Sequence, residues 1–188
     1  MHPLNRYGIK YMKAFITHDV TKIQTDITDT IIPPAAAATY STLKNKLGKE
    51  TFLGEWYLID QDCINQFAKA TGDNQWIHTD SERAKVNSPF KSTIANGFLT
   101  LALIPKLTET IDPEKTPYPE AKMVVMYGLD KVRYLYPIKS GSRVRARIHL
   151  LGLTPIKRSI EVVNKVSIEV ENRSRPACIA EIVLRLRF

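Results

Sequence analysis

An aspartate and a histidine, Asp73 and His78, lie five residues apart in the segment TGDNQWIH of residues 71–78. In a strand-like or irregular segment this spacing can turn both side chains toward one cavity, where together they could hold and deprotonate a water molecule. Further along the chain, Gly97 opens an apolar run, and a glycine that opens a helix offers a free N–H at the positive end of the helix dipole. An acid/base pair with an oxyanion donor indicates chemistry on a carbonyl compound.

Each of these residues also has a purely structural explanation. Asp73 can be a turn or cap residue after a helix that ends at Gly72, and a lone histidine is more often packed or solvent-exposed than catalytic. Gly97 can be required only for tight packing at the start of its helix. The combination of Asp73 and His78 in one motif favours a site over these explanations. Gln75, between them, is a candidate to hydrogen-bond substrate or water.

Regular elements are expected to hold the motif in place. Asp60 is an N-cap candidate for a helix that stops at Gly72, and residues 33–38 are typical of a linker. The run 98–107 is apolar almost all round, which predicts a helix surrounded by protein, and Pro105 could kink it. Strand patterns cover 54–59, 123–127, 132–136, 143–151, 159–170 and 178–188. One buried helix with an antiparallel sheet is an α+β pattern.

The motif and its surroundings resemble the MaoC-like hydratases, in particular the nodulation protein N-like branch. The hydratase motif Gly-Asp-x-Asn-Pro-aliphatic-His is matched at 72–78, with Gln75 and Trp76 in place of Asn-Pro, as in the nodulation branch. Asn96 stands where relatives often have histidine. The resemblance extends roughly from Leu47 to Phe188. Further segments match that branch in order, namely FA at 67–68, HTD at 78–80, RA at 83–84, SPF at 88–90, GFLTL at 97–101, YGLDKVR at 127–133 and GSRVR at 141–145.

This resemblance implies a single hotdog fold, in which a curved antiparallel sheet wraps a long central helix. Residues 1–40 are then an N-terminal extension of unknown role, and residues 41–188 are the MaoC-like hotdog domain. The implied activity is that of an (R)-specific enoyl-CoA hydratase/dehydratase, a hydro-lyase that adds water reversibly to a trans-2-enoyl thioester. The hotdog resemblance also implies a homodimer, because a lone sheet leaves an uncovered edge.

The same hypothesis assigns a role to each candidate residue. Asp73 is expected to be the general base, and His78 to orient the water and help deliver a proton to the α-carbon. The Gly97 N–H is expected to polarise the thioester carbonyl. Gln75 and Asn96 are the further candidates for substrate binding.

Two other classes of function remain open. A hotdog thioesterase would use a similarly placed carboxylate to activate water against the carbonyl carbon. A non-catalytic acyl-thioester-binding protein is favoured by the departures at Gln75, Trp76 and Asn96. The chain has no Gly-x-Ser-x-Gly elbow and no glycine-rich dinucleotide or phosphate loop, and its four histidines are dispersed. We therefore expect acid/base chemistry without metal or cofactor, with CoA or acyl carrier protein as the substrate carrier.

Composition and charge are compatible with this hypothesis but do not establish it. The 188 residues are 44% hydrophobic and 24% charged, with no apolar run near the roughly 20 residues that span a bilayer. The two cysteines, Cys63 and Cys178, are expected to be buried or half-buried thiols of a cytoplasmic protein.

The net charge is +8, with the excess of Lys and Arg in residues 121–188, where RVRAR at 143–147 puts its arginines on one sheet face. A solvated face is the preferred interpretation; attraction of CoA phosphates is the second, and nucleic-acid binding lacks any accompanying motif.

Overall fold

The computed structural model describes residues 34–188 apart from 113, 157 and 158. Residues 1–33, most of the predicted N-terminal extension, lie outside the described residues. In the described part of the chain, six strands form one antiparallel sheet. Five of them follow the order β1–β4–β5–β6–β3, and β2 pairs with β4 as well. The strands are β1 (Glu50–Leu53), β2 (Tyr57–Ile59), β3 (Met123–Tyr134), β4 (Ser142–Ile156), β5 (Ser159–Val170) and β6 (Cys178–Arg187).

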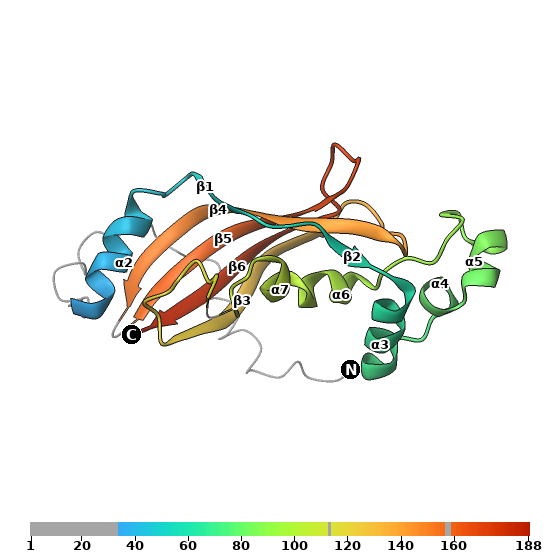
Figure 1. Ribbon diagram of the computed structural model, residues 1–188, viewed down its shortest axis with the longest axis horizontal. Coiled ribbons are helices and arrows are strands. Elements are labelled where there is room, and N and C mark those ends of the chain that lie inside the picture. Colours follow the sequence, from blue (N-terminus) through green and yellow to red (C-terminus); the bar gives the residue numbers. More distant parts are fainter. Residues whose placement is uncertain (1–33, 113, 157–158) are drawn as a thin grey trace, which may run out of the picture. The chain divides into compact units, whose positions relative to one another are not determined.

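The sheet curves over two short helices, α6 (Gly97–Ala102) and α7 (Ile104–Leu107) (Figure 1). Side chains of β4, β5 and β6 alternate between buried and half-buried positions, as the strand patterns predict. The buried set forms the core together with the apolar side of α6 and α7. This is the α+β hotdog arrangement expected from the sequence.

The central helix is interrupted close to Pro105, where the sequence predicted a kink. α6 ends at Ala102 and α7 begins at Ile104. Pro105 lacks the N–H that would bond to the carbonyl of Leu101, so the helical hydrogen-bond ladder cannot continue through this point. The run is also less enclosed than predicted, because Phe98 is 74% exposed although Leu101 and Ile104 are buried.

Three helices are adjacent to the Asp73–His78 motif in the chain: α3 (Gln61–Thr71) precedes it, α4 (Trp76–Thr79) contains His78, and α5 (Ser81–Asn87) follows. Asp60 caps α3 as predicted, because its carboxylate accepts the backbone N–H of Cys63 at 2.8 Å. Gly72 ends α3 in the left-handed conformation with a φ of 77°, which only glycine adopts without strain. His78 lies in the helical turn α4 rather than in a strand-like or irregular segment, which corrects that expectation.

Residues 34–38 begin a helix instead of a linker. The helix α2 (Pro34–Lys44) contains four consecutive alanines, the best helix formers, and has proline in its first turn, where no backbone donor is needed. It packs against β4 and β5 with Ala36 fully buried and Leu43 in the core. Burial of these two side chains explains why the segment folds onto the sheet. None of the described helices is both long and apolar enough to cross a bilayer.

The predicted strand 54–59 forms only from Tyr57 onward, because the chain passes very close to the central helix at Gly54. A Cβ atom at that residue would lie 2.5 Å from the carbonyl oxygen of Leu107. The backbone N–H of Gly54 also bonds to the carbonyl of Ala146 at 2.8 Å. Glycine is therefore required at the point where β1 and β2 separate along β4.

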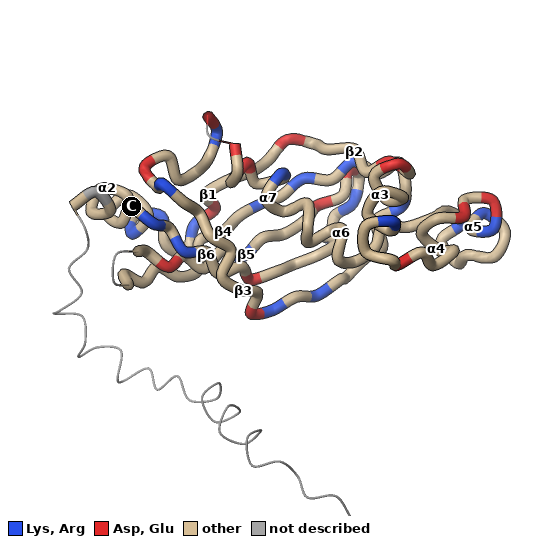
Figure 2. The backbone as a smooth tube through the Cα atoms, turned by 90° about the horizontal axis from the view of Figure 1, so that it is seen from below, with Lys and Arg blue, Asp and Glu red and all other residues tan. Residues whose placement is uncertain are grey.

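Arginines on the outer face of β4 are paired with glutamates of neighbouring strands. Arg145 and Arg147 both contact Glu169 of β5, at 2.8 and 2.6 Å, and Arg147 also contacts Glu50 of β1. Basic and acidic positions accordingly lie close together over the sheet (Figure 2). These pairs occupy the guanidinium groups, which agrees with a solvated sheet face rather than a free phosphate-binding stripe.

Candidate active site

The structure brings the predicted acid/base pair together. His78 Nε2 lies 3.7 Å from Asp73 Oδ2. Asp73 follows Gly72, the residue that ends α3, and His78 lies in α4, the next helical turn. The end of α3 at Gly72 and the start of α4 after Gln75 therefore set the relative position of the two side chains. The His78 side chain is only 8% exposed, whereas the Asp73 side chain is 39% exposed. One member of the pair is thus held in the protein interior while the other meets solvent.

The hydrogen bond on the far side of the His78 ring fixes its tautomer. His78 Nδ1 lies 2.7 Å from the carbonyl oxygen of Ile94. A carbonyl can only accept, so Nδ1 carries the proton and the Nε2 of the neutral ring presents a lone pair. The backbone N–H of Ile94 in turn bonds to the carbonyl of Ile77 at 3.0 Å, which fixes this acceptor relative to α4. His78 Nε2 is therefore available to accept a proton beside Asp73.

Two side-chain amides hold the carboxylate of Asp73. Gln75 Nε2 donates to Oδ1 at 2.9 Å, and Asn96 Nδ2 donates to Oδ2 at 2.7 Å. These donors, Gln75 first and then Asn96, lower the pKa of Asp73 below its ordinary value. Asp73 is consequently ionised at neutral pH and is a weak base.

Asn96 contacts the carboxylate directly, whereas the sequence suggested contact with substrate. It is 1% exposed and precedes the first residue of α6. Its Oδ1 is buried without a hydrogen-bond partner in the described part of the chain. Turning the amide over would place Oδ1 against the Asp73 carboxylate, so the observed orientation is the favourable one. Gln75 likewise binds Asp73, but from an exposed position.

Gly97 and His78 line the same cavity, which has a volume of about 340 Å³. As the first residue of α6, Gly97 has an N–H with no acceptor inside the helix. Gly97 is exposed, and the ring of Tyr134 from β3 lies beside it, since a Cβ atom on Gly97 would be 3.2 Å from the ring. A residue with a side chain would displace the tyrosine from the cavity wall. Gly97 and His78 thus border one space.

Gln61, which was absent from the predicted site residues, holds the backbone of His78 by a hydrogen bond. Its Nε2 donates to the carbonyl oxygen of His78 at 2.7 Å, and its Oε1 accepts the hydroxyl of Thr93 at 2.5 Å. Thr93 is buried and directly precedes Ile94, the residue that accepts from His78. Gln61 therefore ties the α4 turn to the segment before α6. A glutamine at the start of a helix has no distinctive pattern that would have revealed this role.

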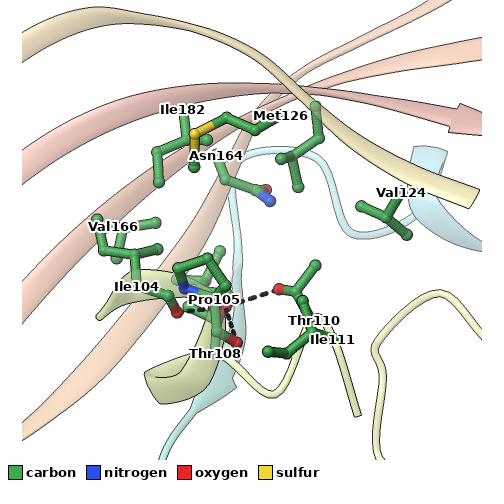
Figure 3. A pocket seen from close by; sticks show the side chains of 12 residues that line it. Ile104, Pro105, Thr108, Thr110, Ile111, Val124, Met126, Asn164, Val166 and Ile182 are labelled. Atoms are coloured by element: carbon green, nitrogen blue, oxygen red, sulfur yellow. Dashed lines mark hydrogen bonds between the residues drawn. The ribbon is translucent and has the colours of Figure 1, made fainter. Parts of the chain in front are cut away.

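A second cavity, of about 110 Å³, lies between α7 and the sheet. Most of the side chains that line it are apolar, among them Ile104, Val124 and Val166, and the polar exceptions are Thr108, Thr110 and Asn164 (Figure 3). Such a space suits an apolar ligand group. Among the residues that the structure describes, no group of three or more His, Cys, Asp or Glu side chains is arranged to hold a metal ion.

The chain matches known proteins over most of its length. The MaoC-like domain family matches residues 42–172. The chain is 42% identical over 139 residues to 3-hydroxyacyl-thioester dehydratase Z of Mycobacterium tuberculosis, covering 73% of this chain and 89% of that protein. It is 41% identical over 145 residues to nodulation protein N of Rhizobium leguminosarum, covering 77% and 88%.

The fold is similar to that of solved structures as well. R-hydratase PhaJ1 from Pseudomonas aeruginosa superposes with a TM-score of 0.59 at 21% identity, covering 79% of this chain and 84% of that one. The names of these relatives and neighbours agree with the hydro-lyase class expected from the sequence. By the extent of the family match and the identity to these relatives, the chain belongs to the MaoC-like domain family.

Proposed function

We propose that this chain is an (R)-specific enoyl-CoA hydratase/dehydratase, which adds water reversibly to a trans-2-enoyl thioester and forms an (R)-3-hydroxyacyl thioester. One observation carries the proposal: His78 and Gly97 line one cavity, with the Asp73 carboxylate 3.7 Å from His78. The names of the dehydratase and hydratase relatives support the same reaction class and the stereochemistry. The thioester is carried by CoA or acyl carrier protein, and the proposed chemistry uses only protein side chains and water.

The Gly97 N–H is the proposed donor to the thioester carbonyl. When water adds to the β-carbon, negative charge moves onto the carbonyl oxygen of an enolate. A donor that is already in place stabilises that charge without reorganisation, and it sits at the positive end of α6. The Tyr134 ring lies against Gly97, which is itself exposed to solvent.

His78 is the proposed proton carrier, in contrast to the expectation that Asp73 is the base. The lowered pKa makes Asp73 the weaker base, whereas His78 Nε2 has a free lone pair. As the water oxygen bonds to the β-carbon, one water proton passes to Nε2. The same proton then moves to the α-carbon, which neutralises the enolate and restores neutral His78. Asp73 accepts a hydrogen bond from the other water hydrogen and stabilises the transient imidazolium.

The acyl chain is proposed to follow the buried face of the central helix. Thr100 lines the cavity beside His78, while Ile104 and Thr108 line the second cavity. Thr100 belongs to α6, whereas Ile104 begins α7 and Thr108 ends it, so we propose that the two cavities are successive parts of one path along these helices. Burial of methylene groups along that path contributes about 0.8 kcal/mol for each group.

A homodimer is proposed on the strength of the β3 edge. β3 is the last strand in the sheet order, and Met123, Met126, Tyr127 and Leu129 on it are exposed. An exposed strand edge with apolar side chains favours pairing with a second copy, and two-fold pairing is the commonest arrangement. Light scattering over a dilution series is expected to give twice the mass of the chain, and a constant monomer mass would contradict the pairing.

The proposed reaction is tested with purified protein and crotonyl-CoA. We expect loss of enoyl absorbance without release of free thiol. Asp73→Asn and His78→Gln should each lower the rate by about 10²–10⁴-fold, the usual contribution of acid/base groups. The double variant should lose far less than the product of the two losses, because both groups act on one water. Asp80→Asn is the matched control, since Asp80 caps α5 through the N–H of Arg83 and an asparagine can cap as well.

The outcomes separate the three classes of function. Release of free thiol would identify a thioesterase. Binding of crotonyl-CoA without turnover would identify a non-catalytic acyl-thioester-binding protein. Hydration at the wild-type rate by both Asp73→Asn and His78→Gln would show that this pair is not the active site.

A further inference from the structure

A buried polar pair interrupts the aliphatic inner face of the sheet. The inward positions of β5 carry isoleucine or valine, except for Asn164. Its Nδ2 donates to the hydroxyl oxygen of Tyr118 at 2.8 Å, and both side chains are buried. A buried polar group that loses its partner costs about 1–3 kcal/mol. Asn164 and Tyr118 therefore depend on each other and hold each other in one position.

This pair separates neighbouring cavities. Asn164 lines both the 110 Å³ cavity beside α7 and a smaller one of about 30 Å³. Tyr118 lines the smaller cavity and a surface groove, but not the larger cavity. Leu43 of α2 lines the smaller cavity as well. The Asn164 amide points into the larger cavity, at the end of the path along the central helix (Figure 3).

We infer that the Tyr118–Asn164 pair is the end wall of the acyl-chain site and restricts the substrates to medium-chain enoyl thioesters. This inference rests on the proposed function. From Gly97 to Thr108 the central helix advances about 16 Å at about 1.5 Å for each residue. An extended carbon chain with bonds of about 1.5 Å advances roughly 1.3 Å for each bond. The wall therefore stops acyl chains of more than about twelve carbons.

A polar wall is suited to this task because its parts are fixed. Flexible aliphatic side chains can repack around one more methylene group, whereas a bonded amide and phenol must break a buried hydrogen bond to move. The chain end that meets the wall is a methyl group, which offers Asn164 no replacement partner. Longer acyl chains are thus opposed by both shape and polarity.

The test uses Tyr118→Ala, which removes the ring and opens the wall toward the smaller cavity. The readout is the ratio of kcat/KM for trans-2-hexadecenoyl-CoA to kcat/KM for trans-2-decenoyl-CoA, measured within each variant. We expect this ratio to rise at least about tenfold, since pockets discriminate methylene groups by about 10–200-fold. A loss of folded protein lowers both values together and leaves the ratio unchanged.

Two controls isolate the wall from general loosening. Leu43→Ala enlarges the smaller cavity but leaves the pair in place, so its ratio should equal that of the wild type. Tyr118→Phe keeps the ring and removes only the hydrogen bond, and its ratio should stay much nearer to the wild type than that of Tyr118→Ala. Equal ratios in Tyr118→Ala and wild type, with both folded by circular dichroism, would overturn the inference. So would wild-type protein that prefers the sixteen-carbon substrate.

Binding of saturated acyl-CoAs, measured by calorimetry, separates this inference from the proposed reaction. Wild-type affinity should increase up to dodecanoyl-CoA and fall for hexadecanoyl-CoA, whereas Tyr118→Ala should not show the fall. This pattern in a protein that never hydrates an enoyl thioester would refute the reaction and retain the wall. Hydration with the same chain-length profile in both proteins would retain the reaction and refute the wall.

Discussion

Replacing Asn96 by alanine removes a donor to Asp73 that solvent cannot easily supply. The amide lies 2.7 Å from Oδ2 and is 1% exposed. Hydrogen bonds to charged groups contribute about 1.5–3 kcal/mol. Because the Asp73 side chain is 39% exposed, water replaces part of the interaction, and we take the lower end. The rate falls roughly tenfold when about 1.5 kcal/mol is lost from the transition state alone, so tenfold is the upper limit expected for Asn96→Ala.

Stability is expected to change much less than activity in this variant. The alanine also removes the buried Oδ1 that has no partner among the described residues, and an unpaired acceptor of this kind costs about 1–3 kcal/mol. The loss of one hydrogen bond and the removal of one unsatisfied atom offset each other. Urea unfolding should therefore give a free energy within about 1 kcal/mol of the wild type.

Initial rates of crotonyl-CoA hydration at neutral pH measure the effect, with Gln75→Ala as the matched control. Gln75 donates to the other oxygen of the same carboxylate, but from an exposed position where water can take its place. We expect no more than about a threefold loss in this control, or about 0.7 kcal/mol, because water takes over most of the hydrogen bond when the exposed amide is removed. Equal losses in both variants would refute the reasoning from burial.

Asn96→Asp adds a pH test at the same place. The two amide donors lower the pKa of Asp73, so its ionised form stabilises the fold above the ordinary value of 3.8, and this contribution disappears as pH falls through the lowered pKa. A second carboxyl beside Asp73 cannot ionise freely. While protonated it donates as the amide does, and after losing its proton it repels Asp73. Hydration by Asn96→Asp should therefore decline with rising pH relative to the wild type.

Three further predictions concern single side chains. Gly97→Ala places a methyl group about 3.2 Å from the Tyr134 ring, and kcat/KM for crotonyl-CoA should fall at least about tenfold. Gln61→Ala releases the His78 carbonyl from Thr93, so ¹⁵N NMR should show a mixture of His78 tautomers where the wild type has the proton on Nδ1. Burial raises the pKa of Cys178 from 9.0 to about 11, so folding favours the protonated thiol. That contribution to the free energy of unfolding is complete below pH 9 and is lost toward pH 11. At pH 10 the free energy of unfolding of the wild type, measured in urea, should have fallen by about 1.4 kcal/mol more than that of Cys178→Val.

Features that depend on neighbouring residues were predictable from the sequence. Asp60 and Gly72 bound α3 as expected, because a cap and a left-handed stop act within one turn of the chain. The alternation of β5 between 159 and 170 was equally plain, since one sheet face is buried along its whole length. The proximity of Asp73 and His78 was predicted from their spacing and motif, although His78 was expected in a strand-like or irregular segment.

Features that depend on distant residues were not predictable in the same way. The alanines of α2 have high helix propensity, yet only the exposed apolar surface of β4 and β5 makes them a packed helix instead of a linker. Asn96 reaches Asp73 across 23 residues, and Gln61 reaches Thr93 across 32. No spacing rule connects such pairs, because the fold alone brings them within hydrogen-bonding distance.

The candidate site lies where two segments of the chain meet, and it contains a buried polar atom without a hydrogen-bond partner among the described residues. His78 reaches across to Ile94, and Asn96 reaches back to Asp73, so two hydrogen bonds in opposite directions join the α3–α4 segment to the start of α6. Both bonds also set the protonation states that the proposed reaction needs. The unsatisfied Oδ1 of Asn96 is located here, in a core whose other buried side-chain polar atoms have partners among the described residues. Native proteins tolerate such groups mainly at functional sites, where orientation outweighs stability. A fold selected only for stability would place an apolar side chain at position 96, and Asp73 would then lose its buried donor.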